Sequence, residues 1–532
     1  GPDATPEQVL ELKVCDPAMG SGAFLVAACR ALGERLVAAW TSWPDKRPKI
    51  PADEDEELHA RRLVAQRCLY GVDKNPRAVD LARLSLWLAT LARDHEFTFL
   101  DHALKCGDSL VGLTPEQIAA ANWDVSKPGL PLFQQLVRDK VAKAMQCRTE
   151  IQNAPDDTMR AIQEARHRNL ESEVSPIRLM GDAVVSAFFA ADKAKAREKA
   201  RADVESHISG MPTRWDLLEA AAVRLRAGEQ GFTPFHWQIE FPEVFARENG
   251  GFDAIAGNPP FLGGKKISTE FGEAYSDWLN ALHNNSNRNG DLVGHFFRRS
   301  FGLIRRGACI GLVGTNKIAQ GETREASLRP ILENEGRITR ATRKYRWPGD
   351  AAVVVSILHI SKCTNQPAFL DEKQVSRISA YLREGNLDCA PLKLAANSRK
   401  AFQGSIILGN GFTFVEAPTA QETSTAEMLD LIESRSNNKD CIRPYIGSDE
   451  VNSCPTHNAD RFAIDFFDMP LKKDAAFGSW YEMTDAAQRA CRSRGVVPVD
   501  YPDRVAEDWP DLLTIVTRLV KPVREVQKRK AL

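Results

Sequence analysis

The sequence predicts an α/β protein built on a mostly parallel sheet, with a large helical insertion and a mixed α+β C-terminal region. Three observations predict this fold class. Strand-like apolar runs alternate with helical patterns over residues 1–112 and 231–361, which is typical of parallel strands joined by crossover helices. Residues 113–230 are rich in Ala, Glu, Lys and Arg, which favour helices. From residue 362 to residue 532 the pattern is mixed and rich in turns.

The first half of the predicted sheet contains three strands. Residues 12–15 are the first predicted strand, followed by a glycine-rich turn and a helical pattern after Ala23. A second strand lies in "CLYGVDKNP" and ends at Asp73, before the helical stretch "RAVDLARLSLWLATLA". The segment "TFLDHALKCGDSL" predicts a third strand that ends near Asp108.

The alternation resumes after the insertion, in which "DTMRAIQEARHRNLESEV" and "ADKAKAREKARADVES" are predicted helices. A strand in "GFDAIAGNPPF" precedes a helix expected from Asp291 to Arg305 and the buried strand "ACIGLVGTN". Two more strands, "RITRATRKYRW" and "DAAVVVSILHIS", are expected to meet at a turn around Pro348 and Gly349. Residues 231–361 therefore predict the second half of the same sheet.

Composition excludes several classes of protein. The 532 residues carry a formal net charge of −1 at pH 7, so overall charge says nothing about a nucleic-acid partner. The 11 cysteines are scattered without a Cys-x-x-Cys pair, which argues for reduced thiols and against a disulfide framework or a zinc ribbon. No apolar run is long enough for a membrane span and no secretory signal pattern is present. We expect a cytoplasmic protein without a bound metal.

Each of the first three predicted strands ends at an acidic residue: Asp16, Asp73 or Asp108. Parallel strands bring their carboxyl ends to one edge of the sheet, where open α/β sheets bind ligands. The turn after Asp16 passes through Gly20 and Gly22 to a helix N-terminus, but lacks the G-x-G-x-x-G spacing of dinucleotide sites. We predict a nucleoside ligand, with an amino group near Asp16, ribose hydroxyls at Asp73 and an exocyclic amine at Asp108.

A second motif, "GNPPF" at residues 257–261, follows the fourth predicted strand. Its two prolines remove two backbone donors and fix the chain as extended or turned. The side-chain carbonyl of Asn258 and the backbone carbonyl of Pro259 can then converge on one amine, hold both its hydrogens and localise the nitrogen lone pair. Phe261 offers a stacking face for an aromatic base. The motif predicts a site that presents an amine for chemistry.

These motifs carry a family resemblance. In this order, "DPAMGSGAFL", "GVDKNP", "CGDSL" and "GNPPF" resemble the cofactor and catalytic motifs of gamma-class DNA adenine-N6 methyltransferases. The segment "WPGDAAVVVSILHISK" resembles the family segment whose aromatic residue, here Trp347, stacks on the target base. "TNKIAQGETRE" and the region 440–530 resemble the large Type IIG-like restriction–modification and BREX/DISARM-type phage-defence methylases. In such proteins a target-recognition domain follows, which we expect to be missing from this chain.

The resemblance implies a Rossmann-like methyltransferase sheet, S-adenosylmethionine as cofactor, and methylation of adenine N6 in flipped-out DNA bases by a bacterial defence system. The implied catalytic residues are Asn258, Pro259, Pro260 and Phe261, with Phe261 and Trp347 stacking on the target base. The implied cofactor-binding residues are Asp16, Pro17, Ala18, Gly20, Ser21, Gly22, Phe24, Asp73, Lys74, Asp108, Ser109 and Asn258. Double-stranded DNA is the expected partner, with Arg298, Arg340, Arg343 and Lys344 as phosphate contacts, and other subunits of a defence system are a second partner class.

Three alternatives stay open. An rRNA or protein-glutamine methyltransferase also uses an Asn-Pro-Pro-aromatic motif, but such enzymes are usually more compact. The chain could be the methylase part of a bifunctional restriction endonuclease, although "LDEKQV" at residues 370–375 lacks the partner acid of a Mg²⁺ nuclease site. A scaffold that only binds nucleic acid would not need two convergent acceptors. Neither zinc nor ATP is implied, since "GGKK" at residues 263–266 lacks the frame of a P-loop.

Overall fold

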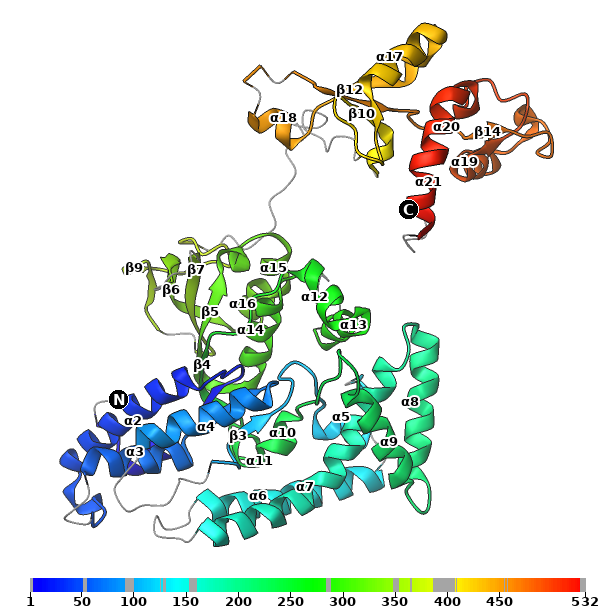
Figure 1. Ribbon diagram of the computed structural model, residues 1–532. Coiled ribbons are helices and arrows are strands. Elements are labelled where there is room, and N and C mark those ends of the chain that lie inside the picture. Colours follow the sequence, from blue (N-terminus) through cyan, green and yellow to red (C-terminus); the bar gives the residue numbers. More distant parts are fainter. Residues whose placement is uncertain are drawn as a thin grey trace. The chain divides into compact units, whose positions relative to one another are not determined.

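Two compact units make up the computed structural model of the protein, residues 1–390 and residues 391–532 (Figure 1). The expected division of the chain at residues 112, 230 and 361 stays a prediction. The structure describes the chain outside a set of short segments: 1–2, 51–54, 91–99, 125, 128–130, 153–159, 284–288, 348–353, 364–365, 386–406, 408, 454, 457 and 527–532.

The first unit is organised around a nine-stranded sheet of order β3-β2-β1-β4-β5-β7-β6-β8-β9. Strands β3, β2, β1, β4 and β5 run parallel, whereas β7 is antiparallel to both of its neighbours. The strands are β1 (Val14–Asp16), β2 (Leu69–Asp73), β3 (Leu104–Cys106), β4 (Phe252–Gly257), β5 (Ile304–Thr315), β6 (Arg337–Arg346), β7 (Val354–Ser361), β8 (Ala368–Leu370) and β9 (Lys373–Val375). The predicted α/β fold is confirmed, and the turn expected at Pro348 and Gly349 lies outside the described residues.

Alternate residues of the central strands face opposite layers of helices, as the period of two along a strand requires. Val14 of β1 and Leu69 of β2 pack with α2 (Ala23–Ser42), α3 (Glu56–Arg67) and α4 (Pro76–Thr90). Cys15 and Tyr70, their neighbours in sequence, pack in a second core with α14 (Leu292–Leu303) and the strand β5. Both faces are covered, so the strands read as continuous apolar runs.

The insertion between β3 and β4 is helical, as predicted. Its helices are α5 (Pro115–Ala119), α6 (Pro131–Gln152), α7 (Arg160–Phe189), α8 (Ala194–Ser209) and α9 (Trp215–Arg226), followed by the short α10 (Trp237–Glu240) and α11 (Pro242–Phe245). The long helices α6 and α7 lie side by side (Figure 1). The insertion has a core of its own, which also contains Tyr275 and Trp278 of α13 (Glu273–Leu282).

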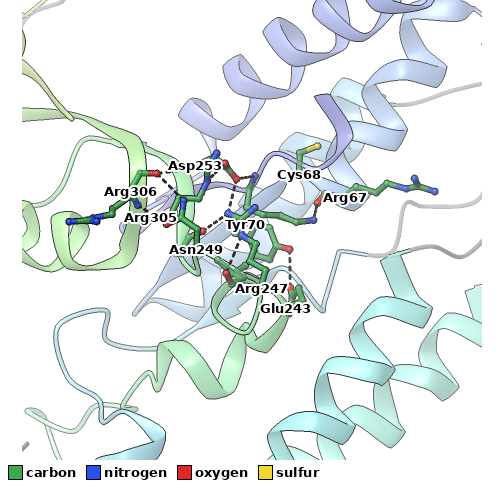
Figure 2. Close-up of polar contacts among 12 residues, drawn as sticks. Arg67, Cys68, Tyr70, Glu243, Arg247, Asn249, Asp253, Arg305 and Arg306 are labelled. Atoms are coloured by element: carbon green, nitrogen blue, oxygen red, sulfur yellow. Dashed lines mark hydrogen bonds and ion pairs between the residues drawn. The ribbon is translucent and has the colours of Figure 1, made fainter. Parts of the chain in front are cut away.

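Charged side chains connect the strands at the edge of the sheet where the parallel strands begin. The carboxylate of Asp253, at the start of β4, accepts hydrogen bonds from the Arg247 guanidinium at 2.8 Å and from Nε of Arg305 at 2.6 Å (Figure 2). It also accepts the backbone N–H of Lys13, one residue before β1, at 2.8 Å. These bonds tie the starts of β1, β4 and β5 together. Open α/β sheets bind their ligands at the opposite edge, where the strands end.

The second unit holds a four-stranded sheet of order β11-β10-β13-β12 and a small two-stranded sheet. Its strands are β10 (Thr413–Val415), β11 (Thr423–Ser424), β12 (Ile442–Tyr445), β13 (Arg461–Ile464), β14 (Lys472–Lys473) and β15 (Val496–Val497). Its longer helices are α17 (Thr425–Ser434), α19 (Asp485–Arg494) and α20 (Pro510–Leu519). Phe414, Ile442, Ile464 and Trp509 form its main core. This content agrees with the mixed α+β region expected from the sequence.

Candidate active site

One cavity of about 440 Å³ lies where β1, β2, β3 and β4 end, a volume in the usual range of small-molecule sites. The sequence predicted nine of the residues in its wall: Pro17, Ala18, Asp73, Lys74, Asp108, Ser109, Asn258, Pro260 and Phe261. Seven further wall residues were not predicted: Gly107, Leu262, Glu270, Phe271, Tyr275, Leu292 and Phe296. The two predicted motif sets, strand-end acids and "GNPPF", thus meet at a single cavity.

Asp16 lies behind the wall rather than in it. Its side chain is buried and accepts the backbone N–H of Ala18 at 3.0 Å, and burial raises its pKa to about 7, helped by the charge of Asp73. The carboxylate lies against Gly257 of β4, where a Cβ would be 2.5 Å from Oδ1 of Asp16. Gly257 therefore makes room for the acid directly before Asn258. The expected crevice with three acids in its wall is corrected to two, because the β1–β4 contact buries the first.

Asp73, at the end of β2, connects the loop after β1 to the loop after β2. Its Oδ2 accepts the backbone N–H of Gly20 at 2.9 Å and its Oδ1 accepts that of Asn75 at 2.8 Å. Gly20 has φ +53°, a left-handed conformation that glycine adopts without strain. A carboxylate has about four acceptor positions, so Asp73 keeps two for a ligand. This arrangement suits a ligand that donates two vicinal hydroxyls to the Asp73 carboxylate.

Asp108 is buried and receives donors from two elements. The Tyr275 hydroxyl lies 3.2 Å from Oδ1 and 3.0 Å from Oδ2, and the backbone N–H of Leu110 donates to Oδ1 at 3.0 Å. Burial raises the pKa of Asp108 above its usual value, and these donors and the charge of Lys74 oppose that rise. The carboxylate therefore lies in the wall as a hydrogen-bond acceptor with capacity left for a ligand.

The "GNPPF" motif leaves two side chains open. Asn258 is exposed at the cavity, and within the described part of the chain its amide makes no hydrogen bond. Phe261 is 37% exposed and lines the same cavity. Pro259 is buried next to them and is not in the wall. An unpaired amide beside an uncovered aromatic ring can hold a planar ligand that carries an amine.

Two short helices cover the cavity, and the sequence did not indicate them as part of the site. They are α12 (Gly264–Phe271) and α13, joined at Gly272, and we call residues 264–282 the cover. The Lys74 ammonium lies 4.0 Å from the centroid of the Phe271 ring, and Trp278 Nε1 donates to the Leu110 carbonyl at 3.1 Å. The cover thus contacts the loops that follow β2 and β3. The one feature of the sequence that could have indicated the cover is the presence of aromatic residues shortly after the Asn-Pro-Pro-Phe motif.

Several predicted residues lie away from the cavity wall. Gly20, Ser21, Gly22 and Phe24 shape the turn and the first turn of α2 without lining the cavity. Gly22 has φ +83° and packs against Ala82 of α4. Trp347 follows β6 and is not in the wall. Its stacking role stays a prediction, because residues 348–353 beside it lie outside the described residues.

The four basic residues expected at DNA phosphates have different surroundings. The half-buried Arg298 guanidinium donates to two backbone carbonyls at 3.2 and 3.5 Å. These contacts join elements of the fold and occupy the guanidinium. Arg343 is paired with Asp371 at 2.7 Å. Arg340 and Lys344 are exposed on β6, and the Arg340 guanidinium lies over an aromatic ring.

The family model of the Eco57I restriction-modification methylase matches residues 67–341, more than half of the chain. The chain belongs to this restriction-modification methylase family. The model of the MmeI DNA-methyltransferase domain also matches, over residues 4–120. The two matches together span the sheet strands β1–β5, the insertion and the cavity, so the gamma-class resemblance seen in the motifs is confirmed.

Curated relatives of this Eco57I-type chain include a putative type II restriction enzyme and methyltransferase of Methanocaldococcus jannaschii. It is 24% identical over 289 residues, which are 48% of this chain and 22% of that protein. DNA methyltransferase A of Bacillus subtilis is 28% identical over 161 residues, which are 28% of this chain and 18% of that protein. The chain therefore spans about one fifth of the length of either relative.

Solved structures similar to the Eco57I-type chain include the Type IIL restriction-modification enzyme MmeI in complex with DNA. It has 14% sequence identity and a TM-score of 0.39, over 97% of this chain and 51% of that one. The M protein of the Type I restriction enzyme EcoKI has 11% identity and a TM-score of 0.28, over 68% of this chain and 44% of that one.

None of the described helices combines the length and the apolar character that a membrane crossing needs. Likewise, the described part of the chain contains no cluster of three or more His, Cys, Asp or Glu side chains arranged for a metal ion.

Proposed function

We propose that this chain transfers a methyl group from S-adenosylmethionine to N6 of adenine in DNA, as the methylase of a bacterial restriction–modification or phage-defence system. The observation that carries the proposal is the shared wall of one cavity. Asp73 and Asp108, acceptors suited to a nucleoside, line it together with Asn258 and Phe261, which suit a planar amine. The family supports DNA as the methylated molecule.

The residues at the cavity fit S-adenosylmethionine. Asp73 has two acceptor positions left for the ribose hydroxyls, and Asp108 can accept the exocyclic amine of the cofactor. The buried carboxylate of Asp16 provides a negative charge near the loop of residues 17–22, where the methionine amino group would lie. When bound, S-adenosylmethionine supplies a methyl carbon on a sulfonium sulfur, which takes the bonding electron pair when it leaves.

Asn258 and Pro259 would bind and orient the target amine. Their two carbonyl oxygens accept both N6 hydrogens, so the nitrogen lone pair is localised and faces the methyl carbon. The new bond joins N6 to that carbon, and one N6 proton then passes to water, so a strong general base is not required. Holding the reactants in line can supply roughly 7–11 kcal/mol of the barrier.

The target adenine must leave the duplex, because its N6 cannot reach a cavity in this protein while it is stacked. Unstacking costs a few kcal/mol. The exposed ring of Phe261 offsets part of that cost, since stacking of a base on an aromatic side chain contributes about 1–3 kcal/mol. Exposed Arg340 and Lys344 remain candidate phosphate contacts, and such contacts make DNA affinity fall as salt rises.

The test is transfer of a radiolabelled methyl group to unmethylated DNA of mixed sequence, followed by nucleoside analysis. Label in N6-methyldeoxyadenosine supports the proposal. Label confined to cytosine derivatives, RNA or protein contradicts it. Equal amounts of RNA and protein acceptors belong in parallel reactions, because an Asn-Pro-Pro-aromatic motif can serve any planar amine or amide.

Cofactor affinity is expected to fall as the pH is lowered through the pKa of Asp16. The folded-state pKa of about 7 means that Asp16 is mostly ionised at pH 7.5 and mostly protonated at pH 6. Only the carboxylate attracts the cofactor's ammonium, so binding should be about fivefold weaker at pH 6, after allowing for fuller protonation of the amino group. Calorimetric titration with S-adenosylhomocysteine measures it. Asp16→Asn should bind weakly at both pH values, and a wild-type affinity that rises toward pH 6 would refute the role.

A further inference from the structure

The cover meets the cofactor wall at one polar contact that the proposed function does not use. Tyr275 is buried, 3% exposed, and its hydroxyl lies within hydrogen-bond distance of both Asp108 oxygens. Its phenol ring packs against Phe271 with ring centroids 4.9 Å apart, so the ring is held in place. Both aromatic residues line the cavity beside Asp108.

A phenol has one proton to donate, and here the acceptor is a carboxylate. Donation from Tyr275 and from the Leu110 N–H stabilises the ionised form of Asp108, whereas burial favours the neutral form. The other charged groups acting on this carboxylate are Lys74, from the loop after β2, and Arg299 of α14. Within the described residues both act on it through their charge, without an ion pair to it. Tyr275 is thus the side chain that bonds directly to Asp108.

The protonation state of Asp108 decides which base it can recognise. An ionised carboxylate accepts a hydrogen bond from the 6-amino group of adenine and repels the 6-oxo group of hypoxanthine. A protonated carboxyl can donate to that 6-oxo group instead. A buried polar group that loses its matching partner discriminates strongly between such analogues.

We propose that Tyr275 is a positioning residue that determines cofactor specificity: it holds Asp108 as an acceptor, so that the cavity selects a 6-amino purine nucleoside over its 6-oxo analogue. This inference rests on the proposed function, because it places the cofactor's purine at Asp108. It adds a residue of the cover, 167 positions away in sequence from Asp108, to the cofactor site.

The chain offers a matched control. Trp278, one helical turn after Tyr275 in α13, also ties the cover to the loop after β3, but through the backbone carbonyl of Leu110. Trp278→Phe therefore removes a hydrogen bond of the cover in which the Asp108 carboxylate takes no part. Tyr275→Phe removes the hydroxyl alone and keeps the ring. A merely structural role for Tyr275 predicts the same behaviour from both variants.

The experiment is calorimetric titration of the full chain with S-adenosylhomocysteine and with S-inosylhomocysteine at pH 6 and pH 8. Selectivity is measured by the dissociation constant of S-inosylhomocysteine divided by that of S-adenosylhomocysteine. For Tyr275→Phe we expect this ratio to fall by about tenfold. The fall should be larger at pH 6, because loss of a donor to the carboxylate raises the pKa of Asp108 and more of it is protonated at the lower pH. For Trp278→Phe, both affinities should change by the same factor.

Three outcomes separate the possibilities. The inference is supported if Tyr275→Phe lowers the ratio and Trp278→Phe does not. In a chain that already carries Asp108→Asn, Tyr275→Phe should then leave the ratio unchanged. An unchanged ratio in Tyr275→Phe, with both affinities lowered as in Trp278→Phe, overturns it and leaves Tyr275 as an anchor of the cover. Failure of the folded wild-type chain to bind either nucleoside contradicts the proposed function itself and overturns the inference with it.

Discussion

Replacing Asn258 by alanine is expected to lower kcat/KM for methyl transfer by about 100- to 1,000-fold, in line with the loss of one polar group that acts on the transition state. Asn258 is exposed at the cavity and carries no hydrogen bond within the described residues, so its amide is available to a ligand. Without its oxygen the target amine keeps one acceptor, at Pro259, and its lone pair is no longer fixed in line. Single-turnover transfer of labelled methyl groups to DNA measures the loss.

Controls must show that the variant has lost chemistry rather than its fold or its cofactor. Because Asn258 is exposed, the alanine variant should unfold at the wild-type temperature, and S-adenosylhomocysteine should bind within a few-fold of wild type. Asn258→Asp keeps an acceptor oxygen and should retain more activity than Asn258→Ala. Full transfer activity in Asn258→Ala would remove the motif from the mechanism. A loss of cofactor binding equal to the loss of activity would instead place Asn258 at the cofactor only.

The sequence predicts the parts of the site that depend on local pattern. Strand ends at Asp73 and near Asp108 could be located because short apolar runs stop close to an acid, and parallel strands place their ends at one edge. The same reasoning puts "GNPPF" after β4, next to β1. What it could not show is which acids face the ligand. Asp16 is buried because Gly257, in a strand 241 positions later in the chain, has no side chain to displace it.

The cover shows a second limit of reasoning from sequence. Residues 264–282 read as ordinary amphipathic helices, and their polar and apolar pattern fits any surface helix. Tyr275 becomes part of the site only through contact with the loop after β3, which the long insertion separates from it. Clusters of basic residues in the sequence likewise do not show which side chains are free to contact DNA. Arg298 stands beside another arginine in sequence, yet its guanidinium binds backbone carbonyls inside the fold.

The insertion is joined to the sheet by a buried polar network that its sequence does not reveal. Arg148 of α6 has a fully buried side chain, and its Nε donates to Oε2 of Glu243, in α11, at 2.9 Å. The Tyr70 hydroxyl on β2 donates to the same carboxylate at 2.9 Å, a contact that Figure 2 shows. Burial alone would raise the pKa of Glu243, but Arg148 and its hydrogen bonds hold that pKa below its usual value. The pair is therefore ionised.

Replacing Arg148 by methionine should destabilise the first unit by about 3–5 kcal/mol, one of the largest effects expected of a single change here. The substitution leaves the Glu243 carboxylate buried without its cation, and an unpaired buried charge costs far more than the pair contributes. The measurement is the free energy of unfolding of the full chain in urea. Unfolding is monitored through a spectroscopic signal that comes from the first unit. A matched surface change, Arg306→Met, removes an exposed ion pair with Glu335 and should cost less than about 1 kcal/mol.

The double variant Arg148→Met with Glu243→Leu decides whether the pair stabilises the fold or only avoids a penalty. Replacing both partners by apolar side chains removes both desolvation costs, so most of the lost stability should return. Tyr70 and Gln152 would then lose an acceptor, although Gln152 still bonds to the Tyr70 hydroxyl at 2.6 Å. If the double variant is as unstable as Arg148→Met, the ion pair itself holds α6 against the sheet. Stability near wild type would mean that shape and apolar contact are enough for docking the insertion.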